Sequence, residues 1–222
     1  MIGMPESARK LLVAYDVAGY SGRGRRREVA SQQRLVDVLH YAFAAAQVQG
    51  YELQEQGDGG LGLLPTGDGV DEVRVIADLI RALEDGLAEI NGDLVAEARI
   101  RLRVALDEGV VQRAAHGFAG YAVTAVCRLR DASVVRESLA GSDADLIVVV
   151  ADHLYQDVLA DGYRRGPAFA QATVTAKEFT GEAWIYLPRN IATANPARIP
   201  VSGEVPNAPK LSAALRTNPQ IW

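Results

Sequence analysis

The sequence is poor in the residues that form cross-links and metal clusters. It has one cysteine, Cys127, so no internal disulfide can form and nothing points to an oxidising compartment. The three histidines, His40, His116 and His153, are far apart and lack metal-ligand spacing. Stability must therefore come from an ordinary hydrophobic core, and 222 residues are enough to build one within a single domain.

Long apolar runs are also missing. No stretch approaches the ~20 apolar residues that a membrane-spanning helix needs, and the N-terminus lacks the pattern of a secretory leader. The formal net charge of −5 argues against a surface that binds nucleic acid. We therefore expect a cytoplasmic protein that binds neither membrane nor nucleic acid.

Short apolar runs and helical periodicities alternate along residues 11–188. Strands are predicted at 11–17, 51–55, 61–64, 99–106, 110–113, 146–150, 171–176 and 182–187. Helices are predicted at 35–46, 73–90 and 118–138, with a short one from the N-cap Asp152. Turns are expected at 56–60 and at 107–109. This order predicts an α+β domain in which helices pack against one mostly antiparallel sheet.

Both ends of the chain differ from this central region. Residues 1–10 precede the first predicted strand and are interpreted as an N-terminal arm. Residues 189–222 contain several prolines, alanines and asparagines and show little periodicity, so we expect an extended C-terminal tail. The domain itself is predicted to span residues 11–188.

Two acids stand where strands are predicted to end. Asp16 closes a buried strand just before a glycine loop, and Asp58 lies at the tip of a hairpin. Acids at two adjacent strand ends can hold a divalent metal ion, and amides at Gly19–Ser21 can cradle phosphates. Four arginines between positions 23 and 27 would attract a polyphosphate. An alternative stays open at this point, in which the acids cap turns and the arginines coat a solvated helix start.

Five segments, in order, resemble motifs of class III adenylate and guanylate cyclase catalytic domains. They are Tyr15–Ser21, Gln56–Gly59, Arg101–Gly109, Gly120–Leu129 and Thr175–Pro188. Each motif alone is weak, but five in register are hard to obtain by chance. The resemblance implies a ferredoxin-like α+β fold. It also implies a nucleotidyl cyclase, a phosphorus–oxygen lyase that converts a nucleoside triphosphate to a 3′,5′-cyclic nucleotide and pyrophosphate.

The resemblance assigns roles to residues at matching positions. Asp16, Asp58 and the carbonyl of Val17 would bind two Mg²⁺ or Mn²⁺ ions, one favouring deprotonation of the ribose 3′-hydroxyl and one holding the triphosphate. The loop residues Gly19, Tyr20 and Ser21 would contact the substrate. Two further catalytic residues are implied, Arg128 from the partner protomer at the α-phosphate and Lys177 at the triphosphate. Each active site would then span a homodimer interface.

The sequence departs from the family pattern at three positions. Thr124 replaces the usual asparagine four residues before Arg128, and it can still donate one hydrogen bond to the ribose. The two base-reading positions carry Gln54 and Gly117, which fit neither the adenine nor the guanine pattern. In this respect the chain is similar to stand-alone Pycsar cyclases, which make cyclic UMP or cyclic CMP as an antiphage signal for a separate effector.

Two alternatives remain. A pseudo-cyclase would keep the fold and bind a nucleotide or a protein partner without turnover, which Thr124 and the unusual base-reading positions favour. A diguanylate cyclase would need a glycine-rich hairpin with two adjacent acids, and Gly57–Leu61 does not supply that pair.

Overall fold

The computed structural model describes residues 7–47, 49–67, 69–162, 168–176 and 179–188. The strands are β1 (Ser7–Val17), β2 (Glu52–Gln56), β3 (Gly59–Pro65), β4 (Leu102–Ala114), β5 (Gly117–Ala119), β6 (Leu146–Ala151), β7 (Ala170–Ala176) and β8 (Phe179–Tyr186). The helices are α1 (Arg25–Ala45), α2 (Glu72–Asn91), α3 (Tyr121–Arg130), α4 (Ser133–Ala140), α5 (Asp152–Leu154) and α6 (Ala160–Gly162). Three short helical segments complete the chain, η1 (Tyr20–Gly22), η2 (Ala96–Ala98) and the π-helical η3 (Tyr155–Leu159).

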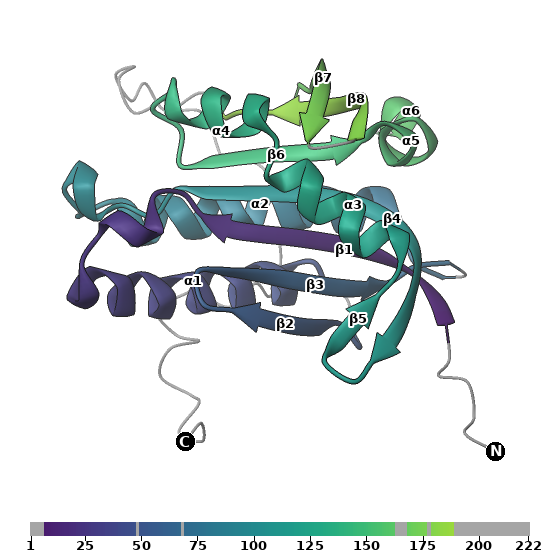
Figure 1. Ribbon diagram of the computed structural model, residues 1–222, viewed down its shortest axis with the longest axis horizontal. Coiled ribbons are helices and arrows are strands. Elements are labelled where there is room, and N and C mark those ends of the chain that lie inside the picture. Colours follow the sequence, from purple (N-terminus) through teal and green to yellow (C-terminus); the bar gives the residue numbers. More distant parts are fainter. Residues whose placement is uncertain (1–6, 48, 68, 163–167, 177–178, 189–222) are drawn as a thin grey trace, which may run out of the picture.

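The strands form one mixed sheet in the order β2-β3-β1-β4-β6-β8-β7, and β5 pairs with the far end of β4 (Figure 1). Among the described strands only β4 and β6 pair in parallel, and α3 and α4 lie in the connection between them. The other pairs are antiparallel. The predicted α+β class with a mostly antiparallel sheet is confirmed.

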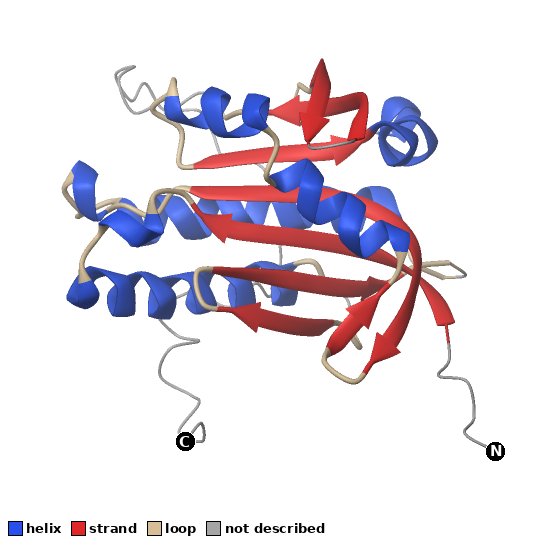
Figure 2. Ribbon diagram, in the orientation of Figure 1, coloured by secondary structure: helices blue, strands red, loops and turns tan. Residues whose placement is uncertain are grey.

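Helices cover both faces of the sheet (Figure 2). Side chains alternate along a strand, so Leu11, Val13 and Tyr15 of β1 pack in the cluster that includes α1 and α2. Leu12 and Ala14 face the other way and pack with α3 and α4. Strand β1 is therefore buried on both sides, which explains its continuous apolar run.

The predicted turn at residues 107–109 is wrong. Strand β4 runs without a break through these positions, and the chain turns back only after Ala114 to form β5. Gly109 instead allows α3 to pack closely against β4, because a Cβ atom at this position would lie 2.6 Å from the Cβ of Ala122 on α3. Glycine is thus needed for helix packing and not for chain reversal.

Two helix predictions also need correction. The single helix expected at 118–138 is two helices, α3 and α4, separated at Asp131 and Ala132. Asp152 is not the N-cap of α5; Ala151 takes that position, and the Asp152 carboxylate accepts a hydrogen bond of 2.9 Å from the Trp184 indole.

The ends of the domain are covered only in part. Strand β1 begins at Ser7, within the stretch interpreted as an arm. The predicted tail at 189–222 lies outside the described residues and stays a prediction. In the described part of the chain, no helix is long and apolar enough to cross a membrane.

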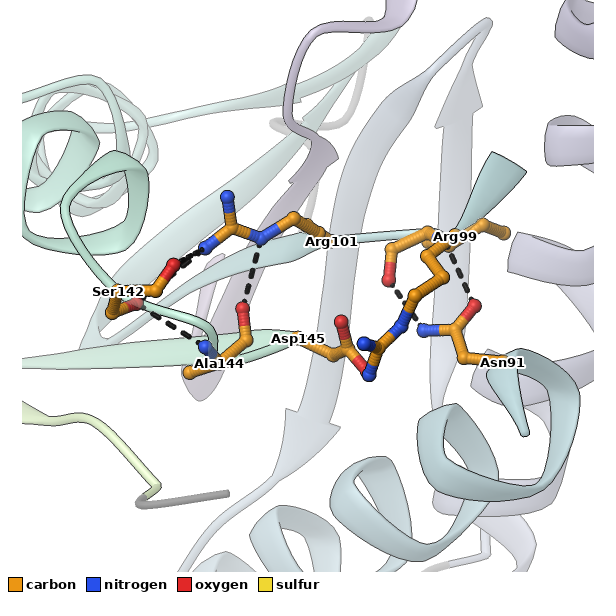
Figure 3. Close-up of polar contacts among 7 residues, drawn as sticks. Asn91, Arg99, Arg101, Ser142, Ala144 and Asp145 are labelled. Carbon is orange, nitrogen blue, oxygen red and sulfur yellow. Dashed lines mark hydrogen bonds and ion pairs between the residues drawn. The ribbon is translucent and has the colours of Figure 1, made fainter. Parts of the chain in front are cut away.

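Polar contacts fix the entrance to β4 (Figure 3). The Asn91 side chain donates to the carbonyl of Ile100 at 2.8 Å and accepts from its N–H at 2.9 Å. Arg101 donates to the carbonyls of Ala144 at 2.9 Å and Ser142 at 2.7 Å. These contacts tie β4 to α2 and to the segment before β6, which sets the position of the residues that follow Arg101.

Candidate active site

The two predicted metal-binding acids lie at adjoining strand ends. Asp16 is opposite Gly59 in the β1–β3 register, and the N–H of Val17 donates to the carbonyl of Asp58 at 2.8 Å. A Cβ atom at Gly59 would lie 2.4 Å from the carbonyl oxygen of Tyr15 and 2.8 Å from the Cβ of Asp16. The glycine after Asp58 therefore allows the hairpin to lie against β1, which places Asp16 and Asp58 at neighbouring backbone positions.

Arg103 holds the carboxylate of Asp16. The two residues face each other in the β1–β4 register, and the guanidinium donates from Nε to Oδ1 at 2.8 Å and from Nη2 to Oδ2. Both side chains are mostly buried. Burial raises the pKa of Asp16, and the bond from Arg103 acts in the opposite direction.

The sequence prediction missed Arg103, although a signal was present. Arg101 and Arg103 are two positions apart in a predicted strand, so both side chains are expected on one face of the sheet. Asp16 lies opposite Arg103 because of the register in which β1 pairs with β4. This register cannot be predicted from the sequence of either strand alone.

The donor set suits a hard divalent cation. Mg²⁺ is usually bound through one or two carboxylates together with waters and substrate phosphates, and Asp16 and Asp58 supply two carboxylates with backbone carbonyls beside them. Across the described ranges, no group of three or more acidic, histidine or cysteine side chains gathers in one place. The two carboxylates fit an ion that shares its coordination with a nucleotide. One of them, Asp16, is already in contact with Arg103.

The glycine loop after β1 has the predicted position. Gly19 adopts a left-handed conformation with φ of 66°, and Tyr20 and Ser21 follow in η1. Arg23, one of the four arginines expected to attract a polyphosphate, turns inward and donates to the carbonyls of Arg99 at 2.9 Å and Ala18 at 3.2 Å. Arg23 thus holds the loop, and the three exposed arginines at 25–27 remain for an anion.

A second group of predicted residues lines a cavity of about 690 Å³ beside α3. Thr124 and Arg128 lie one helical turn apart and both line it. The other lining residues are Val123, Cys127, Asp131, Ser133, Arg136 and Thr175. Lys177 lies outside the described residues, two positions after Thr175. Arg136 was missed, because nothing in a surface helix marks one arginine as facing a cavity.

The predicted base-reading pair is brought into contact. Gly117 begins β5 with φ of 98°, and a Cβ atom there would lie 2.2 Å from Oε1 of Gln54 on β2. The amide of Gln54 therefore fills the space that a side chain at position 117 would take. Nearby, Arg113 stacks over the Phe118 ring at 5.1 Å and pairs with Glu52, which joins the β4–β5 hairpin to β2.

Arg130 joins α3 to β1, the strand that carries Asp16. Its Nη1 donates to the carbonyl of Tyr15 at 3.3 Å, and its Nε pairs with Asp131 at 2.9 Å. The C-terminal end of α3 is therefore close to Asp16 within one chain. Arg128, two positions earlier, makes no such contact among the described residues and instead lines the cavity.

In sequence comparisons no family model and no curated protein matches this chain. The fold is nevertheless that of class III adenylate and guanylate cyclase catalytic domains. A solved adenylate/guanylate cyclase/hydrolase from Silicibacter pomeroyi is 19% identical with a TM-score of 0.58, over 82% of this chain and 98% of that one. The guanylate cyclase domain from Catenaria anguillulae, solved with GTP, is 15% identical with a TM-score of 0.53, over 82% and 97%.

A bacterial light-regulated adenylyl cyclase is also similar, at 12% identity and a TM-score of 0.57, and the match spans 82% of this chain and 53% of that longer protein. At these identities the similarity establishes the fold. Arguments about activity depend on the residues of this chain.

Proposed function

We propose that this chain is a nucleotidyl cyclase that converts a nucleoside triphosphate to a 3′,5′-cyclic nucleotide and pyrophosphate at a homodimer interface. The observation that carries the proposal is the neighbouring backbone position of Asp16 and Asp58 at adjoining strand ends, where the Val17 N–H donates to the Asp58 carbonyl at 2.8 Å, in a chain with a cyclase fold. The placement of Thr124 and Arg128 on one cavity supports the second half of the site.

The chain's own residues have defined tasks in this reaction. Two Mg²⁺ or Mn²⁺ ions, when bound, would lower the pKa of the ribose 3′-hydroxyl and neutralise the leaving pyrophosphate. Asp16, Asp58 and the Val17 carbonyl would hold them. The 3′-oxygen forms a bond to the α-phosphorus as the bond to the β-phosphate oxygen breaks, and Arg128 stabilises the charge that develops on the α-phosphate. Thr124 would donate to the ribose.

The position of Arg128 supports the proposed homodimer. In the described part of the chain its cavity is lined by α3, α4, Thr175 of β7 and Asp131 between the two helices, and neither of the proposed metal-binding acids contributes to it. The arginine of one protomer would therefore serve the acids of its partner. Lys177, in the hairpin between β7 and β8, would extend the same surface toward the triphosphate.

The base is proposed to be a pyrimidine. Gly117 offers no side chain, and the amide of Gln54 lies against it. The Gln54 amide can both donate and accept, so it excludes no base, and the assignment depends on the absence of the adenine and guanine patterns at Gln54 and Gly117. The product would be cyclic UMP or cyclic CMP, acting in antiphage defence through a separate effector.

The experiment that tests the cyclase is a product analysis. The purified protein is incubated with Mn²⁺ and equimolar ATP, GTP, CTP and UTP, and the products are identified by mass spectrometry. A cyclic monophosphate that disappears in Asp58→Ala would support the activity and identify the base. Turnover of ATP or GTP alone would refute the pyrimidine assignment.

A second candidate is a pseudo-cyclase that binds a nucleotide without turnover. The bidentate contact of Arg103 with Asp16 favours it, since this contact neutralises one of the two metal-binding acids. Absence of product from a dimer that still binds nucleotide would select this reading.

A further inference from the structure

The cavity of about 690 Å³ beside α3 is lined by a second arginine, Arg136 of α4, in addition to Arg128 of α3. Thr124 and Arg128 lie one turn apart on α3, and Ser133 and Arg136 lie three positions apart on α4, so each helix turns one face toward the cavity. A cavity of this volume is in the range of pockets that bind small molecules. Two helices therefore each contribute one guanidinium to the same space.

These two arginines have no countercharge within the described part of the chain. Neither Arg128 nor Arg136 forms an ion pair or a hydrogen bond there through its side chain. Asp131, the acidic residue among those that line the cavity, accepts from Nε of Arg130 at 2.9 Å and from Nη2 at 3.0 Å. The charge of Asp131 is thus balanced by a third arginine, which leaves the cavity with an excess of positive charge.

The other polar groups of the cavity are also able to bind an anion. Thr124, Ser133 and Thr175 each have a hydroxyl that can donate a hydrogen bond. Guanidinium groups form paired, charge-assisted hydrogen bonds with phosphate oxygens. Two such groups with three hydroxyls suit an anion that has several phosphates, and they disfavour a cationic ligand.

The position of α4 indicates which part of a triphosphate Arg136 can reach. Helix α3 packs against β1 and β4, whereas α4 packs against β6 and β7, the strand that leads to Lys177. In the proposed function Thr124 contacts the ribose, Arg128 the α-phosphate and Lys177 the triphosphate. Arg136 therefore lies on the side of Arg128 where the phosphate chain continues, away from the ribose.

We propose that Arg136 is a substrate-binding residue that holds the terminal phosphate of the triphosphate, next to the α-phosphate at Arg128. The inference rests on the proposed function, which assigns the cavity of one protomer to the nucleotide on its partner. After ring closure the same guanidinium holds the pyrophosphate product. Arg136 thus adds a contact on α4 to a site whose other proposed residues lie on β1, β3, α3 and the β7–β8 hairpin.

The test is the binding of inorganic tripolyphosphate in the presence of Mg²⁺, measured by isothermal titration calorimetry. Arg136→Gln is expected to bind about tenfold more weakly than the unmodified protein, because it loses a charge-assisted contact. Arg136→Lys should keep part of the affinity, since it retains the charge without the paired donors. Arg81→Gln is the matched control, because it removes an exposed arginine of α2 outside the cavity, and its affinity should not change.

Steady-state kinetics distinguishes substrate binding from a structural role. Arg136→Gln is expected to raise KM about tenfold and to leave kcat within about twofold, because the terminal phosphate keeps its bonds while the ring closes. The rise in KM should be the same for every nucleotide that is turned over, since all of them carry the same triphosphate. A lower kcat with unchanged KM would contradict the assignment.

Unchanged tripolyphosphate binding by Arg136→Gln, an equal loss in Arg81→Gln, or no binding by the unmodified protein would overturn the proposal. Native mass spectrometry tests the dimer, and its loss in Arg136→Gln would make Arg136 an interface residue instead. Thermal unfolding establishes that each variant is folded, and Arg136→Lys provides the test if Arg136→Gln does not fold. Product formation with unchanged tripolyphosphate affinity refutes the role of Arg136 alone, whereas weaker binding by Arg136→Gln without product from any variant refutes the cyclase alone.

Discussion

The two halves of the candidate active site are built in different ways. The acidic half, Asp16 and Asp58 with Val17 between them, is fixed by backbone pairing of β1 with β3 and is partly neutralised by Arg103. The arginine half, Thr124 and Arg128 on α3, faces a cavity of about 690 Å³, and neither side chain has a hydrogen-bond partner among the described residues. In the acidic half Asp16 is paired with Arg103 within the chain, whereas in the other half Arg128 faces a cavity without an ion-pair partner among the described residues.

This difference indicates which half of the candidate site lacks a countercharge within the protomer. A paired acid can be stable in an isolated protomer, since its charge is compensated locally. An unpaired arginine at a cavity is the pattern expected where an anionic ligand or a second subunit supplies the countercharge. The comparison therefore supports a site completed by a second copy of the chain, and variants in either half can test it.

The largest effect is expected from breaking each half separately and then combining them. Asp58→Asn and Arg128→Gln should each lower turnover by about 10²–10³-fold, because each removes charge stabilisation of the transition state. After subunit exchange between the two variants, activity should return to about a quarter of the unmodified level, since one intact site forms in each mixed dimer. The readout is cyclic product measured by mass spectrometry.

Native mass spectrometry provides the control for that experiment by detecting the mixed dimers. Mixed dimers without recovered activity would show that the acids and Arg128 do not meet across the interface. Arg81→Gln, an exposed arginine on α2 outside the cavity, serves as the charge-matched variant for Arg128→Gln.

A smaller effect is expected at the glycine that shapes the acidic half. Gly59→Ala should lower the free energy of unfolding by about 1–3 kcal/mol, because its Cβ atom would overlap Tyr15 and Asp16. Gly22→Ala is the control, since its Cβ atom would meet nothing within 4 Å and its φ is not positive. Urea denaturation measures both, and equal stability of the two variants would contradict the close approach.

The contact between Gly117 and Gln54, the proposed base-reading pair, offers a comparable test. Gly117→Ala should cost about 1–3 kcal/mol through its positive φ and its overlap with Gln54. Adding Gln54→Ala should recover the part due to overlap, which a double-mutant cycle isolates. If the losses of unfolding free energy from the two substitutions simply add, the alanine side chain at 117 and the Gln54 amide do not overlap. A change in the relative turnover of CTP and UTP in these variants would link the contact to base choice.

A last comparison sets Asp16 against a second buried acid, Asp107, which pairs with His153 at 3.1 Å instead of with an arginine. Burial raises the pKa of Asp107 to about 6, with the His153 contact acting in the opposite direction. Between the usual carboxyl range near pH 4 and pH 6 the folded protein binds the extra proton, so stability should fall as pH rises through this window.

Asp107→Asn should remove this pH-dependent fall in the free energy of unfolding, which is expected to be on the order of 1–3 kcal/mol in the unmodified protein. The measurement is the free energy of unfolding in urea from pH 4 to 7, with the exposed Asp93→Asn as control. An unchanged pH profile in Asp107→Asn would show that Asp107 titrates normally.

The sequence predicted the strands and helices well where one signal dominated. The apolar run of β1, the glycine-rich turn before Gly59 and the inner stripe of α2 gave elements close to those observed. The error at residues 107–109 arose because a glycine beside two acids is typical of a turn, and the true reason for Gly109 is its contact with Ala122 on a different element.

The sequence supplied the candidate residues of the site, and the structure decided how they are placed and paired. Asp16, Asp58, Thr124 and Arg128 stand out through local motifs, which depend only on neighbours along the chain. Arg103 could not be assigned, because its partner lies 87 positions away and is set by strand register. Local propensity and hydrophobic pattern act within a segment, whereas register, close packing and the pairing of buried charges arise only when distant segments meet.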